Sequence, residues 1–179
     1  MRGSCRIRNS FPAMNYAPLL KKLILRRPAL TLAVAESLTA GHLQAKIAAV
    51  SGASDFFLGG VTAYSLEQKV KLLGVNRAHA RRVNCVSQRV AVEMVYGVAQ
   101  LFGADLAAAT TGYAEPSAAD GVKSPMAWWA ICQRVKGGRL VLNSGTVEVP
   151  GANRTEAQAR IAEDVLGLLV AHVAAWREQ

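Results

Sequence analysis

Apolar residues recur at helical spacing in several segments of the chain. In the first of these segments, Leu19, Leu20, Leu23 and Ile24 would share one face of a helix. Pro28 ends that helix, because the residue before a proline is pushed out of the α region. The same periodicity predicts four more helices, over residues 42–50, 67–73, 88–102 and 154–176.

The ends of three of these helices carry local signals. Ser87 is suited to cap the N-terminus of the helix over 88–102, and Gly103 is suited to end it. Gly74 closes the helix over 67–73 in the same way. Asn153, with Glu156 three residues later, resembles a capping box that opens the last helix.

Compact apolar runs bounded by polar turns predict strands between the helices. These runs cover residues 30–35, 58–64, 106–111, 126–135 and 139–149, and the last two are joined by a short turn at 136–138. Strands that alternate with helices and end in a hairpin favour an α/β fold: a three-layer α/β/α sandwich around a mixed sheet with an antiparallel edge.

Length and composition fit one domain. The chain has 179 residues, of which 51% are hydrophobic and 18% charged, so it can bury a core and is not intrinsically disordered. No apolar run approaches the roughly 18 residues of a membrane helix. Residues 14–179 are predicted to form the domain. Residues 1–13 lack the apolar stretch of a secretory signal and are predicted to be a basic, disordered extension.

The net charge of +9 is concentrated near the N-terminus. Residues 1–30 hold seven of the 21 basic residues and none of the 12 acidic ones, so the rest of the chain is nearly neutral. We interpret this charge as a solvated tail and helix face rather than a nucleic-acid site. The three cysteines are widely spaced and the histidines scattered, which indicates a reducing, cytoplasmic setting without a metal site.

Two strand ends could carry chemistry, because sites in open α/β sheets form beyond the carboxyl ends of the strands. Ser37 and Thr39 follow the first strand, and the N-terminus of the next helix could hold an anion or the oxyanion of acyl transfer. Thr111 and Gly112 end another buried strand. On residue type alone, Ser and Thr at such positions are more often simple helix caps, and Thr111-Gly112 is more often a plain turn at the end of a strand. The chain has no P-loop, dinucleotide fingerprint or G-x-S-x-G elbow.

Four motifs occur in an order that resembles a known family. They are A-E-S-L-T at 35–39, G-G-V-T-A-Y-S at 59–65, K-V-K-L-L-G-V at 69–75 and F-G-A-D-L-A at 102–107. Together with the helix opened by N-R-T-E, they resemble the CinA C-terminal domain family and its stand-alone nicotinamide-nucleotide amidases. The resemblance implies hydrolysis of the carboxamide of nicotinamide mononucleotide to nicotinate mononucleotide and ammonia, in pyridine-nucleotide salvage. It also implies no cofactor, a nucleotide substrate and a homodimer or higher homo-oligomer.

The resemblance also assigns candidate site residues. Ser37 corresponds to the family's nucleophile, Lys69 to the base, Ser54 to a relay serine and Tyr64 to the tyrosine of A-Y-S. A neutral lysine amine can accept the serine proton if burial lowers its pKa. The substrate-binding candidates are Thr39, Gly41, Thr111, Gly112 and Arg154, and the arginine is suited to a phosphate.

Several positions depart from the family pattern. The usual S-C-T-G-G has Leu38 and Ala40 in place of a cysteine and a glycine, and the loop after Gly112 loses glycines and gains Glu115. A carboxylate there would repel a phosphate at close range. These departures motivate the alternative hypothesis that the chain binds a nucleotide or a protein partner without turnover.

Overall fold

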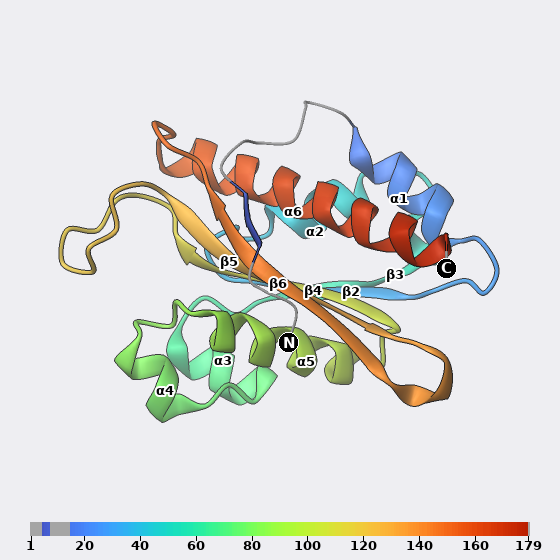
Figure 1. Cartoon of the computed structure of the whole chain (residues 1–179), viewed down its shortest axis with the longest axis horizontal. Coiled ribbons are helices and arrows are strands. Elements are labelled where there is room, and N and C mark those ends of the chain that lie inside the picture. The colour runs from blue at the N-terminus through green and yellow to red at the C-terminus, as the bar shows by residue number, and fades with distance from the viewer. Residues whose placement is uncertain (1–4, 8–14, 179) are drawn as a thin grey trace.

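One mixed sheet forms the centre of the molecule (Figure 1). The structure is a computed structural model that describes residues 5–7 and 15–178. Its strands lie in the order β1-β6-β5-β4-β2-β3. Their bounds are β1 Cys5–Ile7, β2 Leu32–Glu36, β3 Phe57–Thr62, β4 Leu106–Tyr113, β5 Met126–Arg134 and β6 Leu140–Glu148. β3, β2 and β4 run parallel, β5 is antiparallel to both β4 and β6, and β1 is parallel to β6.

Helices cover both faces of this sheet, which confirms the three-layer α/β/α sandwich (Figure 1). On one face lie α1 Tyr16–Ile24, α2 His42–Ala48 and α6 Arg154–Arg177. On the other lie α3 Leu66–Leu73, α4 Arg77–Arg82 and α5 Gln88–Phe102. Two short 3-10 turns, Ala53–Asp55 and Lys136–Gly138, precede β3 and β6.

The two faces of the central strands differ in side-chain size. Both β2 and the first six residues of β4 are fully buried. Leucine, valine and isoleucine dominate under α1 and α6, whereas the sheet face under α5 is built mainly of alanines: Ala33, Ala35, Ala107, Ala109 and Ala130. Small side chains let α5 lie close to the sheet, and this closeness brings the α3–α4–α5 layer to the carboxyl ends of β2 and β3.

The predicted helix ends are confirmed. The hydroxyl of Ser87 accepts the backbone N–H of Val90, and Asn153 and Glu156 form the reciprocal capping box. Gly74 and Gly103 both adopt left-handed conformations just beyond their helices.

Two elements differ from the prediction. α4 was missed, because its sequence RAHARR has no apolar stripe; it is defined instead by the cap of Asn76 and the buried Ala80. The hairpin of β5 and β6 lies one strand inside the edge, since β1 pairs with β6. β1 lies within the extension expected to be disordered, of which residues 1–4 and 8–13 lie outside the described residues.

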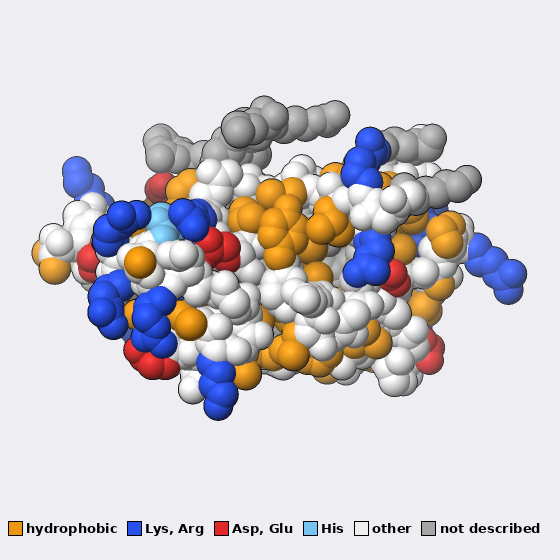
Figure 2. Space-filling model, turned by 90° about the horizontal axis from the view of Figure 1, so that it is seen from below, with side chains coloured by type: hydrophobic (Ala, Val, Ile, Leu, Met, Phe, Trp, Pro, Cys, Tyr) orange, Lys and Arg blue, Asp and Glu red, His pale blue; other side chains and the backbone are white. Residues whose placement is uncertain are grey.

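The surface of the α3–α4–α5 layer is basic at one end. Seen from this side (Figure 2), Lys and Arg side chains gather toward the end where α4 lies, and α4 itself contributes Arg77, Arg81 and Arg82. Among the helices of residues 15–178, even the 24-residue α6 lacks the apolar length required to cross a bilayer.

Candidate active site

A buried lysine faces a serine at the carboxyl end of β2. Ser37 is the first residue after β2, and its backbone N–H donates to the carbonyl of Thr110 on the neighbouring β4. Lys69 projects from α3, and its Nζ lies 2.9 Å from the Oγ of Ser37. Lys69 is 1% exposed and Ser37 is 7% exposed, so water has little access to this contact.

Two backbone carbonyls fix the direction of the lysine amine. Lys69 Nζ donates to the carbonyl oxygens of Ala63 and Tyr64, each at 2.9 Å. Burial lowers the pKa of Lys69 from the usual 10.5, because the charged form loses its hydration, while the nearby Cys85 thiol has the opposite effect. The residues around Lys69 therefore favour a neutral amine more than water does.

The turn between β2 and α2 is braced from inside by a carboxylate. Glu36 is fully buried, and its side chain accepts the backbone N–H groups of Gly41, Leu43 and Gln44 at 2.8–3.0 Å. These are donors of the first turn of α2, so the expectation that this helix end holds an oxyanion is wrong: Glu36 already uses these donors.

Other donors beside Ser37 remain available. Within the described residues, the backbone N–H groups of Leu38 and Thr39 make no hydrogen bond, whereas the N–H of Ala40 closes the turn onto the carbonyl of Ser37. Ala40 has φ +49°, a left-handed conformation that favours glycine. The turn thus presents the Ser37 hydroxyl with two free amides directly after it.

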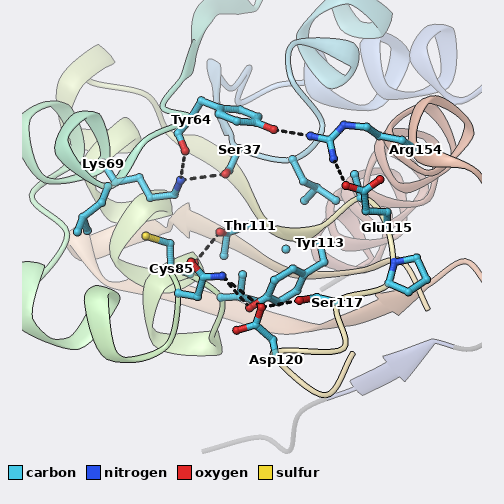
Figure 3. A pocket seen from close by; sticks show the side chains of 17 residues that line it. Ser37, Tyr64, Lys69, Cys85, Thr111, Tyr113, Glu115, Ser117, Asp120 and Arg154 are labelled. Carbon is cyan, nitrogen blue, oxygen red and sulfur yellow. Dashed lines mark hydrogen bonds and ion pairs between the residues drawn. The ribbon is translucent and has the colours of Figure 1, made fainter. Parts of the chain in front are cut away.

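A cavity of about 450 Å³ opens in front of Ser37 and Lys69 (Figure 3). Its walls come from the ends of β2, β3 and β4, from the turn before α5 and from the N-terminus of α6. The lining residues are Ser37, Leu38, Tyr64, Leu66, Lys69, Asn84, Cys85, Val86, Thr111, Gly112, Tyr113, Ala114, Glu115, Pro116, Ser117, Asp120 and Arg154.

Six of the nine sequence-predicted site residues meet in this cavity: Ser37, Tyr64, Lys69, Thr111, Gly112 and Arg154. The hydroxyl of Thr111 donates to the carbonyl of Cys85 at 2.7 Å, which ties β4 to the turn before α5. Gly112 lines the cavity but has a structural reason to be glycine. A Cβ there would lie 2.1 Å from the carbonyl oxygen of Met126 on β5.

The structure does not bring Ser54, Thr39 or Gly41 into the cavity. Ser54 is exposed in the turn before β3, at the opposite end of the sheet, because Phe57 pairs with Leu32 at the start of β2. The five residues of β2 separate it from Ser37 by about 15 Å, too far for a proton relay.

Thr39 and Gly41 shape the turn instead of binding substrate. The hydroxyl of Thr39 is fully buried against the hydroxyl of Thr110 at 2.8 Å. Gly41 has φ +102° and donates its N–H to Glu36. Both residues support the position of Ser37 from behind, so their assignment to substrate binding is corrected.

Sequence reasoning missed one wall of the cavity. Asn84 and Cys85 adopt left-handed conformations, with φ of +47° and +61°, in the turn between α4 and α5. The amide of Asn84 donates to the Tyr113 hydroxyl at 3.2 Å and to Asp120 at 3.4 Å, so it joins this turn to the segment after β4. Asn84 is a residue type that tolerates the left-handed conformation, but this local signal does not indicate that the turn lies beside the end of β4.

Comparisons with known proteins identify a family model and related sequences that match this chain. The model of the CinA C-terminal domain family matches residues 17–173. A CinA-like protein from Chlorobium limicola is 37% identical over 147 residues, which cover 80% of this chain and 33% of that protein. One from Picosynechococcus is 46% identical over 106 residues, covering 59% of this chain and 25% of that protein. The chain thus spans only a quarter to a third of these relatives.

Solved structures share the fold over most of the chain. A CinA superfamily protein from Klebsiella pneumoniae has a TM-score of 0.77 at 28% identity, covering 91% of this chain and all of the other. One from Escherichia coli has a TM-score of 0.74 at 27% identity, covering 88% of each chain.

Proposed function

The chain belongs to the CinA C-terminal domain family, and we propose that it is an amidohydrolase that converts nicotinamide mononucleotide to nicotinate mononucleotide and ammonia. Ser37 is the nucleophile and Lys69 the general base. The observation that carries the proposal is the buried 2.9 Å contact between Lys69 Nζ and Ser37 Oγ.

The three neighbours of Lys69 Nζ satisfy a charged ammonium, which donates to all of them, and they also allow the neutral amine to act as a base. A neutral amine has two N–H groups and one lone pair. If the two N–H groups donate to the carbonyls of Ala63 and Tyr64, the lone pair points at the remaining neighbour, the Ser37 hydroxyl. The amine can therefore accept the serine proton without changing its position.

Hydrolysis then proceeds in two halves. Ser37 Oγ attacks the carboxamide carbon and its proton passes to Lys69, while the N–H group of Leu38, which lines the cavity, stabilises the negative oxygen. The C–N bond breaks as Lys69 protonates the departing nitrogen, which leaves as ammonia. Water then attacks the acyl-serine ester, with Lys69 again accepting a proton, and the carboxylate is released as Ser37 recovers its hydrogen.

The cavity fits such a substrate in size and polarity. A volume of about 450 Å³ lies within the range of small-molecule sites. Tyr64 and Tyr113 offer aromatic rings to a pyridine, and Arg154 lies at the mouth, where the far end of a nucleotide would emerge.

Ammonia release from nicotinamide mononucleotide tests the proposal. Ser37→Ala and Lys69→Ala should each lower the rate by about a thousandfold or more, because each removes a group that acts directly on the reacting atoms. Turnover by the parent that survives either substitution would contradict the assigned pair.

Two matched variants control for the loss of a hydroxyl or an amine elsewhere. Ser54→Ala removes an exposed serine at the other end of the sheet, and Lys71→Ala removes an exposed lysine from α3. Both should retain the parent rate within about twofold, the margin of ordinary surface substitutions.

A second candidate function is nucleotide binding without turnover. It is favoured by an ion pair between Glu115 and Arg154, which occupies the arginine expected to meet the phosphate. This function predicts binding of nicotinamide mononucleotide in a calorimeter without ammonia release by the parent protein.

A further inference from the structure

Both arms of the Arg154 guanidinium are already engaged by other side chains. One terminal nitrogen donates to the carboxylate of Glu115 at 2.9 Å, and the other donates to the Tyr64 hydroxyl at 2.7 Å. All three side chains line the cavity, and Figure 3 shows the contacts between them. The group best suited to a phosphate therefore holds a carboxylate of its own chain.

Glu115 belongs to the segment after β4, and hydrogen bonds hold this segment to the wall of the cavity opposite Arg154. The residue lies two positions after β4, 39 positions before Arg154. Within that segment, Asp120 accepts the hydroxyl of Ser117 at 2.6 Å and the amide of Asn84 at 3.4 Å. These bonds keep the segment, and with it Glu115, against the cavity without an added ligand.

The ion pair is open to competition because solvent reaches it. The side chains of Arg154 and Glu115 are 46% and 61% exposed, and pairs of this kind contribute little net stability. A phosphate can therefore displace the carboxylate. The displaced carboxylate remains nearby, tethered to its segment, and repels the double negative charge that replaced it.

We propose that Glu115 is a specificity-determining residue: a tethered carboxylate that competes with a substrate phosphate for Arg154. It lowers the affinity of the cavity for phosphorylated amides relative to the same amides without phosphate. The inference rests on the proposed function only in assuming that the far end of the substrate reaches Arg154.

Binding of ribose 5-phosphate tests the competition without any need for turnover. This probe carries the phosphate but no amide, and its affinity is measured by calorimetry at low ionic strength for the parent and for Glu115→Gln. The substitution should tighten binding about fivefold to tenfold, since it removes both the competitor and the repulsion. Ribose without phosphate should show no difference.

Glu163→Gln is the matched control. Glu163 lies on the same helix as Arg154 and pairs with Lys46 at 2.6 Å, so this change removes one carboxylate from an ion pair without touching the cavity. It should leave ribose 5-phosphate binding unchanged. Arg154→Gln should weaken binding, and adding Glu115→Gln to it should give a smaller gain than in the parent, because only the repulsion is left to remove.

Kinetics provide a second measurement. If the parent hydrolyses nicotinamide mononucleotide, Glu115→Gln should lower KM for it by a similar factor with kcat unchanged, while the values for nicotinamide riboside stay the same. Equal affinities of the parent and Glu115→Gln for ribose 5-phosphate, including binding by neither, would overturn the inference. Tighter binding of ribose 5-phosphate by Glu115→Gln, together with no ammonia release by the parent, would support the inference about Glu115. It would contradict only the proposed amidase activity.

Discussion

In the mechanism we propose, the protonation state of the Lys69 amine controls the reaction. Charged Lys69 can donate to all three of its neighbours, Ser37, Ala63 and Tyr64, but cannot accept a proton from any of them. In the proposed mechanism, only the neutral amine activates the serine. Burial lowers the pKa of Lys69 and so increases the neutral fraction at a given pH.

The proposed mechanism predicts a rise of activity with pH. Because the neutral form is the active one, kcat/KM for ammonia release should increase with pH through the pKa of Lys69, with a midpoint below the usual 10.5. Lys69→Arg should be nearly inactive and lack this rise, since a guanidinium does not lose its proton. A parent profile that stays flat over the whole pH range in which the protein remains folded would argue against Lys69 as the base.

The same pKa affects stability in a defined direction. Between the lowered folded value and 10.5, the unfolded chain binds more protons at Lys69 than the folded chain does. The contribution of this group to the free energy of unfolding therefore rises with pH across that window and is smallest below it. The protein sacrifices some stability at neutral pH to keep this amine buried.

The backbone conformation of Ala40 also lowers the stability of the folded protein. Its φ of +49° is disfavoured for a residue with a Cβ, so Ala40→Gly should raise the free energy of unfolding by about 1 kcal/mol. Chemical denaturation measures the difference. Ala49→Gly is the control: Ala49 ends α2 with φ −67°, so glycine there should lower stability by about 0.5–1 kcal/mol. Equal effects at both sites would contradict the argument.

At the scale of elements, the position of α3 depends on its contact with α5. Gly97 of α5 lies so close to the end of α3 that a Cβ would meet the carbonyl oxygen of Leu73 at 2.2 Å. Lys69 lies one helical turn before Leu73 on the same helix. The depth at which Lys69 enters the cavity is therefore set by a glycine outside it.

Gly97→Ala should consequently affect both stability and activity. The added methyl must push α3 away from α5, which should cost about 2 kcal/mol in the free energy of unfolding. It should also lower kcat for ammonia release more than it raises KM, because the amine moves relative to Ser37. Unchanged stability, measured by chemical denaturation, would show that the helices separate without cost.

Elements with a periodic apolar face or a local cap could be predicted from the sequence, and those defined by long-range contacts could not. Ser87, Asn153 and Gly74 mark helix ends through bonds within a few residues of each other. α4 has no apolar stripe and exists because Asn76 caps it and Ala80 is buried. The turn at Asn84 and Cys85 is held by bonds to residues of β4 and the segment beyond it.

At the scale of the whole molecule, the site forms where five separate parts of the chain converge. The family resemblance identified Ser37 and Lys69, which the fold brings together across 32 positions of sequence. The resemblance placed Ser54 beside them as well, but the parallel pairing of β2 and β3 puts that residue at the far end of the sheet. The pairing register of β2 and β3 determines which residues lie at the same end of the sheet, and no single residue type encodes that register.

The buried carboxylate of Glu36 has a consequence for how this family can diversify. The bonds by which Glu36 braces the turn that carries Ser37 involve no residue of the segment after β4, which contributes Glu115 to the opposite wall. That segment can exchange residues without disturbing the nucleophile. Substitutions in this segment of the chain can therefore change which ligands the cavity accepts while the position of Ser37 stays the same.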